Sequence, residues 1–183
     1  MPKYRRTSDN VEHRMHDDEW YRRKYGTFDG GKGFNSKERV RQFGEVFTPR
    51  WLVEKMLDEV PDVENVEKTV FEPCCGEGAF ITCVLRRKLA RARTDAQRVR
   101  ACQTCYGLDI QLDNVEICRA RMTAIAASHG VDLDTSARIF CTNIIHGDML
   151  FFPMIARFYD WETGTWETLE EMEVNDENES EKG

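Results

Sequence analysis

Between residues 48 and 61, apolar residues recur at the spacing of one helix face. They follow Thr48-Pro49, a pair that suits a helix start because threonine caps well and proline fits the first turn. This face consists of Leu52, Val53, Met56, Leu57 and Val60. The pattern therefore predicts a helix that begins behind Thr48 and that Pro61 ends.

Beyond this helix, strand-like and helix-like stretches alternate. Short apolar runs rich in β-branched and aromatic residues predict strands at residues 69–71 and 105–110, and a third within residues 138–145. Longer amphipathic stretches predict helices at residues 79–92 and 112–128. Strands that alternate with helices of this length are typical of a parallel sheet with crossover helices, so the expected fold class is α/β.

The helix predicted at residues 79–92 separates apolar from basic side chains. The inward residues are expected to be Phe80, Cys83, Val84 and Leu89, and the outward ones Arg86, Arg87, Lys88, Arg91 and Arg93. Residues 86–100 together hold seven basic residues and one acid. Two interpretations stay open for this run, a solvated helix face and a surface that contacts DNA phosphates.

The two ends of the chain differ from its centre. Residues 1–35 are polar and are expected to form an arm with one short helix near residues 17–25. Residues 170–183 hold seven carboxylates and are expected to form an acidic, disordered tail. The remaining residues, 36–169, are predicted to be a single domain that closes with a β-hairpin at 156–169.

Charge and cysteine content narrow the class of protein. The 183 residues carry a net charge of −7, but residues 1–50 are basic by four charges and residues 151–183 acidic by eight. The N-terminal block thus leaves nucleic-acid contact open despite the acidic total. No apolar run approaches a membrane span and the N-terminus lacks a secretory signal, so a cytoplasmic protein without membrane contact is expected.

The seven cysteines are odd in number and irregular in spacing, which favours reduced thiols over a disulfide framework. Cys102 and Cys105 have the spacing of half a zinc site, but no second pair follows. The expectation is therefore buried structural thiols and no metal.

Candidate binding residues follow each predicted strand. Gly76 and Gly78 lie where the first strand passes into a helix, where free amide groups and a tight turn suit an anionic or closely approaching ligand. Asp109 ends the second strand, where an acid can accept hydrogen bonds from ribose hydroxyls and Ile110 can pack on a flat base. Asp148 follows the third strand. Because ligands bind at the carboxyl ends of parallel strands, these residues are expected to form one site.

Four motifs together resemble those of the amino-group, N6-adenine DNA methyltransferases, as found in the modification subunits of type I restriction systems. They occur in the family's order over residues 44–150: GEVFTP at 44–49, EPCCGEGAF at 72–80, GLDI at 107–110 and GD at 147–148. The resemblance implies a partial Rossmann-like methyltransferase fold and S-adenosylmethionine as the cofactor. It also implies a role in DNA methylation within a restriction–modification system.

The resemblance also assigns the cofactor-binding residues. Phe47 and Thr48 would touch the methionine part of S-adenosylmethionine, and the loop from Glu72 to Phe80, with Gly76 and Gly78, would line it. Asp109 would hold the ribose, Ile110 would pack on the base and Asp148 would hold the adenine amino group.

The family's catalytic motif, Asp/Asn-Pro-Pro followed by Tyr or Phe, has no counterpart here. The five prolines, at positions 2, 49, 61, 73 and 153, are never adjacent. No catalytic residue is therefore assigned, and methyl transfer is expected to need a partner, either a second methyltransferase subunit or a second copy of the chain. The 33 residues after Leu150 are expected to be too few for a catalytic and DNA-reading half.

Three further readings stay open. The chain is alternatively a non-enzymatic partner or decoy subunit of a restriction–modification system, a methyltransferase for another substrate, or a folded remnant without a ligand. Five aromatic residues near the C-terminus are open to two interpretations, stacking on a flipped base or forming the core of the hairpin. They are Phe151, Phe152, Tyr159, Trp161 and Trp166.

Overall fold

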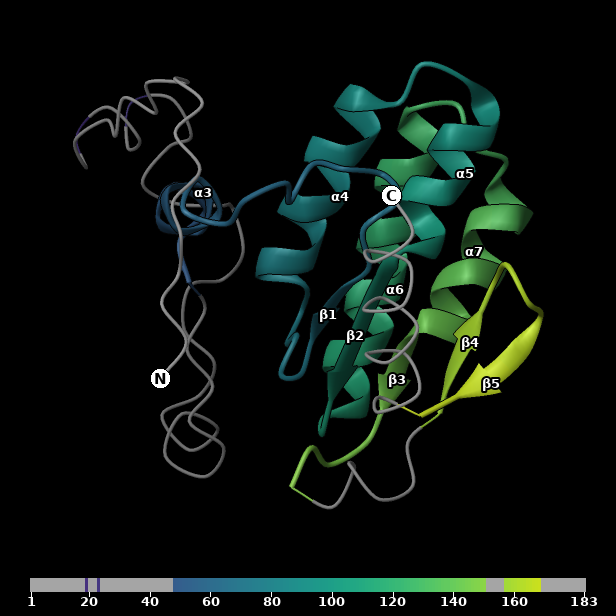
Figure 1. Cartoon of the computed structure of the whole chain (residues 1–183). Helices are drawn as coiled ribbons and strands as arrows, with labels where there is room; N and C mark the ends of the chain where they lie inside the picture. The colour runs from purple at the N-terminus through teal and green to yellow at the C-terminus, as the bar shows by residue number, and fades with distance from the viewer. Residues whose placement is uncertain (1–18, 20–22, 24–47, 151–156, 169–183) are drawn as a thin grey trace, which may run out of the picture.

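The computed structural model of the chain describes residues 19, 23, 48–150 and 157–168. The described part is a mixed α/β fold with five helices and five strands (Figure 1). In chain order these are α3 (Arg50–Leu57), β1 (Val70–Glu72), α4 (Ala79–Arg91), α5 (Asp95–Gln103), β2 (Cys105–Asp109), α6 (Leu112–Ser128), α7 (Leu133–Asn143), β3 (Ile144–His146), β4 (Phe158–Asp160) and β5 (Thr165–Glu167).

Three strands form a parallel sheet in the order β1-β2-β3. Glu72 of β1 pairs with Gly107 of β2, and Asp109 of β2 pairs with His146 of β3. The carboxyl ends of the three strands therefore lie at one edge of the sheet. The parallel sheet and the helices between its strands confirm the α/β class predicted from the alternating pattern.

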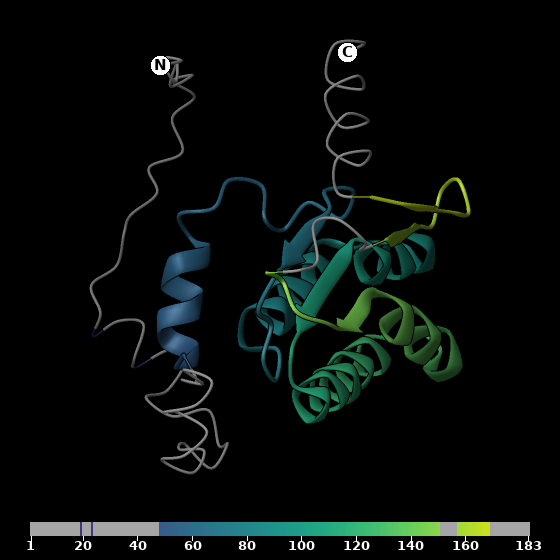
Figure 2. The same cartoon turned by 90° about the horizontal axis from the view of Figure 1, so that it is seen from below.

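The side chains of β2 alternate between two apolar clusters. Cys105 belongs to the larger cluster, which all the helices from α3 to α7 help to form. Tyr106 and Leu108 point to a smaller cluster with Phe158 of β4. Figure 2 shows the β4–β5 pair at the top of that view and α6 and α7 at the bottom. The five residues of β2 are all buried, as expected for the central strand of a covered sheet.

Lys88 lies inside the core and is not exposed to solvent, which corrects the expectation that it points outward. Its ammonium group donates a hydrogen bond to the Thr104 hydroxyl at 2.8 Å and another to the Lys68 carbonyl oxygen. Burial lowers the pKa of this amine. Lys88 therefore joins α4 to the backbone before β1 and to the residue before β2, and so fixes the amino ends of two neighbouring strands.

The third strand lies at the end of the range in which it was predicted. Residues 138–143, the first part of the predicted range 138–145, belong to α7, and β3 comprises Ile144–His146. Asp132 caps α7 by accepting a hydrogen bond from the Thr135 amide at 2.8 Å. The buried side chains of α7 then follow helical spacing at Ser136, Ile139, Phe140 and Asn143. The prediction did not recognise this helical spacing, because the apolar residues Ile144 and Ile145 follow directly and suggest a strand.

Two other helices also differ from the prediction. Helix α5 was not predicted, although Thr94 and Gln97 form a reciprocal capping box at its start, a signature readable in the sequence. Helix α3 begins at Arg50 and ends at Leu57, before Val60. Of its predicted apolar face, Val53 and Leu57 are buried, whereas Met56 and Val60 are about half exposed.

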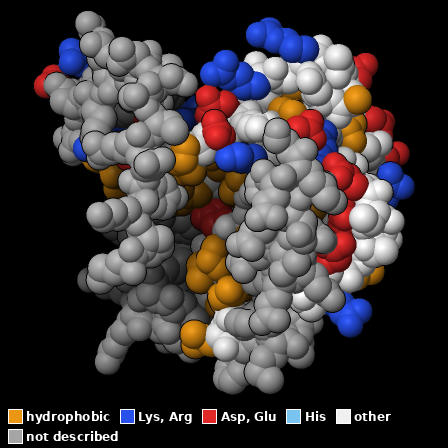
Figure 3. All heavy atoms as spheres, in the orientation of Figure 1, with side chains coloured by type: hydrophobic (Ala, Val, Ile, Leu, Met, Phe, Trp, Pro, Cys, Tyr) orange, Lys and Arg blue, Asp and Glu red, His pale blue; other side chains and the backbone are white. Residues whose placement is uncertain are grey.

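Most of the basic run at residues 86–100 is engaged within the protein. Arg87 binds Glu54 at 2.9 Å and Asp58 at 2.6 Å, which ties α4 to α3. Three more arginines of the run, Arg91, Arg98 and Arg100, form ion pairs with acidic neighbours. Figure 3 shows basic and acidic side chains next to each other in the upper part of the molecule. The run is thus mainly a set of internal and surface ion pairs, which does not favour a phosphate-binding surface.

Strands β4 and β5 pair antiparallel and pack beside the sheet. The indole of Trp161 donates a hydrogen bond to the side-chain amide oxygen of Asn143 at 2.9 Å, and the Tyr106 hydroxyl donates one to the backbone carbonyl oxygen of Tyr159 at 2.8 Å. The Tyr159 ring contacts the rings of Trp161 and Trp166 edge-on, at 4.9 and 5.3 Å between centroids. These aromatic residues therefore pack on one another within the pair.

Several predictions fall on residues that the structure does not describe. They concern the acidic tail at 170–183, the residues Phe47, Phe151 and Phe152, and the arm at 1–35, of which only Glu19 and Arg23 are described. The division into arm, domain and tail stays a prediction. Among the helices of the described residues, none is long and apolar enough to cross a membrane.

Candidate functional site

A pocket of about 420 Å³ lies where the three parallel strands end. Its wall combines strand ends, the turn before α4 and the start of α6, and we call it the strand-end pocket. Its lining residues are Thr48, Glu72, Pro73, Cys74, Cys75, Gly76, Glu77, Ala79, Phe80, Leu108, Asp109, Ile110, Gln111, Asn114, Gly147, Asp148, Met149 and Leu150. The size and the mixture of apolar and carboxylate side chains are typical of a small-molecule site.

The turn from Pro73 to Gly78 is held by backbone hydrogen bonds. The Cys75 amide donates to the Leu108 carbonyl oxygen at 2.8 Å, and the Gly78 amide donates to the Cys75 carbonyl oxygen at 2.8 Å. Gly76 and Gly78 have φ values of +52° and +88°, a backbone region that glycine adopts without strain. The turn therefore presents its backbone to the pocket while α4 begins directly behind it.

The two glycines have different surroundings, which predicts different costs for alanine. A Cβ at Gly78 would lie 2.8 Å from the sulfur of Cys118, whereas a Cβ at Gly76 would meet no atom within 4 Å. We expect Gly78→Ala to lower the free energy of unfolding by about 2–4 kcal/mol, from backbone strain plus a clash. Gly76→Ala should cost only about 1–2 kcal/mol, from backbone strain alone. Urea unfolding of both variants measures the difference, and equal costs would contradict it.

Asp109 connects the glycine turn to the start of α6. Its Oδ2 accepts a hydrogen bond from the Gly76 amide at 2.8 Å. Its Oδ1 accepts one from the Gln111 amide at 2.9 Å and a longer one from the Asn114 side chain at 3.4 Å. The carboxylate is buried, with 8% of the residue exposed. It is therefore a fixed, hydrogen-bonded anion in the wall of the pocket.

Glu72 is a second acid in the wall, at the end of β1. Its Oε2 accepts a hydrogen bond from the Ile81 amide at 3.0 Å, so it also caps the start of α4. Burial, and to a lesser extent the nearby Asp109 carboxylate, raise the pKa of Glu72 to about 8. Glu72 is therefore mainly protonated at neutral pH, and a cation placed beside it would favour its ionised form.

The carboxylates act on the other polar groups of the pocket as well. Burial, followed by the charges of Asp109, Glu72 and Asp148, raises the pKa of the Cys74 thiol. The negatively charged thiolate form of Cys74 is thus disfavoured in the pocket. The same field favours a positively charged ligand.

The end of β3 completes the pocket. The Gly147 amide donates a hydrogen bond to the Asp109 carbonyl oxygen at 3.0 Å, and a ring nitrogen of His146 lies 3.0 Å from the Ile110 carbonyl oxygen. Asp148 follows directly, and its carboxylate accepts a hydrogen bond from the Leu150 amide at 2.9 Å. These bonds hold the ends of β2 and β3 together, so that Asp148 and Ile110 border the same space.

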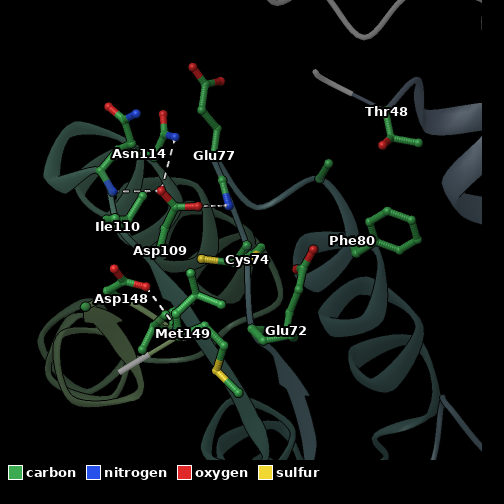
Figure 4. Close-up of a pocket in the computed structure, with 18 residues that line it drawn as sticks. Thr48, Glu72, Cys74, Glu77, Phe80, Asp109, Ile110, Asn114, Asp148 and Met149 are labelled. Carbon is green, nitrogen blue, oxygen red and sulfur yellow. Dashed lines mark hydrogen bonds between the residues drawn. The ribbon is translucent and has the colours of Figure 1, made fainter. Parts of the chain in front are cut away.

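Figure 4 shows how the side chains divide the pocket. Asp109, Ile110 and Asn114 lie on one side of this view, Thr48 and Phe80 on the other, and Glu72 between them. The pocket is thus suited to an elongated ligand with one end among the first group and the other near Thr48.

Seven of the nine residues predicted to bind a cofactor line this one pocket. They are Thr48, Glu72, Gly76, Phe80, Asp109, Ile110 and Asp148. Gly78 lies outside the lining and supports the turn from behind, and Phe47 is not among the described residues.

Asn114 also lines the pocket, although it was not predicted from the sequence. It is a polar residue on the otherwise apolar buried stripe of α6, beside Val115 and Cys118, and only 3% of it is exposed. A polar side chain on such a stripe needs a hydrogen-bonding partner, and this pattern could have identified it. Within residues 48–150 and 157–168, no group of three or more potential ligands has metal-binding geometry. Cys102 and Cys105 are both fully buried.

Comparison with known proteins gives one family. No curated protein and no solved structure matches the chain significantly. The family model for N-6 DNA methylase matches residues 33–155, about two-thirds of the chain, and this stretch contains the glycine turn and all three strand ends. The chain therefore belongs to the N-6 DNA methylase family.

Proposed function

We propose that the chain binds S-adenosylmethionine in the strand-end pocket and takes part in the N6-adenine methylation of DNA within a restriction–modification system. The observation that carries this proposal is the convergence of three strand-end acids, Glu72, Asp109 and Asp148, with the glycine turn on one pocket. Membership of the N-6 DNA methylase family supports it. The sheet order β3-β2-β1 supports it too, because this is the first half of the Rossmann-type order 3-2-1-4-5-6.

The residues present fit this cofactor. S-adenosylmethionine carries a sulfonium and an ammonium group, and the pocket holds several carboxylates whose charges favour cations. Its volume of about 420 Å³ lies within the usual range of about 300–1,000 Å³ for small-molecule sites. When bound, the cofactor supplies an electrophilic methyl group on sulfur.

The chain's own residues would hold the cofactor as follows. Asp109 would bind the ribose, Ile110 would pack on the adenine and Asp148 would accept from the adenine amino group. Thr48 and Glu72 would hold the methionine part, with Glu72 beside its ammonium group. This order agrees with their arrangement along the pocket in Figure 4.

The test is calorimetric titration of the protein with S-adenosylhomocysteine, which has the same nucleoside and amino-acid ends. Binding at micromolar to tens of micromolar concentration is expected. Absence of heat and of any shift in thermal unfolding at 1 mM ligand, a concentration that reveals even weak binding, would overturn the proposal.

Cofactor binding is expected to release a proton from Glu72. With a pKa of about 8 in the free protein, Glu72 must ionise to pair with the ammonium group. Affinity for S-adenosylhomocysteine should then rise by up to about tenfold between pH 6 and pH 7. Glu72→Gln should remove this dependence. Glu77→Gln, in the same pocket but paired with Arg121 at 2.7 Å, should retain it. A pH-independent affinity in the parent would contradict the assignment.

Methyl transfer is expected to need residues from outside these 183, supplied by a partner. The sequence contains no Pro-Pro pair to orient the target amine, and the described aromatic residues Tyr159, Trp161 and Trp166 pack on one another. Incubation of the pure protein with DNA and methyl-labelled cofactor should therefore transfer no label. Clear transfer to DNA would refute this expectation.

A second candidate function is that of a binding subunit without its own chemistry. Among the described residues, β1 pairs with a strand on one side only, through β2. An open edge invites pairing with another chain. Light scattering should then show a dimer, or a complex with a second methyltransferase subunit. A monomer that binds cofactor and methylates DNA unaided would exclude this candidate.

A further inference from the structure

Two carboxylates of the chain occupy backbone amides of the glycine turn and of the start of α4. A glycine turn that leads into a helix is a ready binding site for phosphate, because the first amides of the helix have no partner within it. Here the Gly76 amide donates to Oδ2 of Asp109 at 2.8 Å, and the Ile81 amide donates to Oε2 of Glu72 at 3.0 Å. The chain's own acids therefore take two of the places that the phosphate of a ligand would use.

Other amides of this stretch are bonded to the backbone. The Cys75 amide donates to the Leu108 carbonyl oxygen, and the Gly78 amide donates to the Cys75 carbonyl oxygen, both at 2.8 Å. These two bonds hold the turn against β2, so the turn cannot release them without moving. Four amides within residues 75–81 thus have acceptors inside the protein.

The charges around the turn also oppose a phosphate. Among the described residues, the lining of the strand-end pocket holds four acids and no lysine, arginine or histidine. The acids are Glu72, Glu77, Asp109 and Asp148. The nearby Arg121 pairs with Glu77 and does not belong to the lining. A phosphate in this pocket would therefore meet like charges without a basic side chain to offset them.

Glu72 is the acid closest to where the phosphate of a nucleotide would lie. With the ribose at Asp109, a nucleotide carries its phosphate on the 5′ carbon, where S-adenosylmethionine carries its sulfur and the methionine part. In the proposed arrangement this part lies beside Glu72. Figure 4 shows Glu72 and Asp109 on opposite sides of Cys74, a residue of the turn, in this view.

We propose that Glu72 determines the specificity of the strand-end pocket against nucleotides: its carboxylate occupies the Ile81 amide and places negative charge where the 5′ phosphate would lie. This inference rests on the proposed function, because it assigns a role to a residue of the same pocket. The pocket then accepts adenine nucleosides whose 5′ substituent is neutral or cationic and rejects those with a phosphate.

The experiment compares adenosine with adenosine 5′-monophosphate, which differ only in the phosphate. Their dissociation constants are measured on the full chain by displacement of S-adenosylhomocysteine, at about pH 9, where most of Glu72 is ionised because its pKa is about 8. The parent should bind the monophosphate at least about tenfold more weakly than adenosine. In Glu72→Ala this ratio should fall to about threefold or less, because the variant frees the Ile81 amide and removes the charge.

Two further variants sharpen the comparison. Glu72→Gln is nearly the same size as the parent side chain and removes only the charge, so it should also lower the ratio, and it serves if Glu72→Ala does not fold. Glu77→Gln removes a charge from the same lining, but Glu77 is paired with Arg121, so this control should keep the ratio of the parent.

The outcomes separate this inference from the proposed function. If the parent binds S-adenosylhomocysteine and also binds the monophosphate within threefold of adenosine, the inference alone is wrong. The same holds if the Glu72 variants keep the ratio of the parent, or if Glu77→Gln lowers it as much as they do. If the parent does not bind S-adenosylhomocysteine, the proposed function is wrong and this inference falls with it.

Discussion

Replacing Asp109 with alanine is expected to weaken S-adenosylhomocysteine binding at least about 100-fold. The carboxylate accepts hydrogen bonds from the Gly76 and Gln111 amides, so it holds the glycine turn against the start of α6. Alanine removes both bonds together with the acceptor for a ribose hydroxyl. The hydrogen bond that the charged carboxylate makes to the ribose hydroxyl contributes about 1.5–3 kcal/mol, which at its upper end reaches the roughly 2.8 kcal/mol that a 100-fold change requires. The loss of the two bonds within the protein adds to this, because the glycine turn is then no longer held in place for the ligand.

Calorimetric titration of three variants tests this expectation. Asp109→Asn keeps one acceptor oxygen and should lose about tenfold. Asp134→Ala is the matched control, since Asp134 is an exposed acid in the first turn of α7 and lies outside the pocket lining. It should bind as the parent does. An Asp109→Ala affinity within threefold of the parent would show that the ribose is held elsewhere.

The largest expected effect on stability comes from Lys88→Ala, which should lower the free energy of unfolding by about 3–5 kcal/mol. The substitution removes a fully buried side chain and leaves a cavity among the residues that surround α4. It also removes the donor that the Thr104 hydroxyl and the Lys68 carbonyl oxygen share. Buried acceptors without a donor cost about 1–3 kcal/mol.

Lys88→Met separates the two contributions. Methionine fills most of the volume but donates no hydrogen bond, so this variant should lose only about 1–3 kcal/mol. Arg86→Met, at an exposed position of the same helix, should stay within about 0.5 kcal/mol of the parent. Urea unfolding measures all three. If Lys88→Ala left the free energy of unfolding unchanged, the hydrogen bonds and packing of the buried Lys88 side chain would contribute nothing to stability.

The position of the candidate site could be predicted from the sequence because acidic residues lie at or just after the ends of the predicted strands. Glu72 and Asp109 end strands, and Asp148 follows the third one by two residues. In a parallel sheet the carboxyl ends share one edge, so residues 76 positions apart in the sequence come to border one pocket. Glycines at 76 and 78 were also readable, because the turn into α4 demands positive φ values.

The predictions failed where a local pattern had two readings. The apolar residues Ile139, Phe140, Ile144 and Ile145 fit a strand as well as the end of a helix. The Asp132 cap and the burial of Ser136 decide for the helix. Lys88 was read as outward because lysine is rarely buried, and its partners come from residues 16 and 20 positions away.

The sequence by itself determined the alternation of helices and strands, the glycine turn and the strand-end acids, because each depends on a local period or a local backbone requirement. Only the tertiary structure decided which groups share their hydrogen-bonding capacity. Asp109 receives donors from Gly76, 33 positions away, from Gln111 just before α6 and from Asn114 within α6, so one carboxylate joins these segments in the wall of the pocket. The reason is physical: acceptor positions are filled by groups that are close in space, and only the folded chain brings them together.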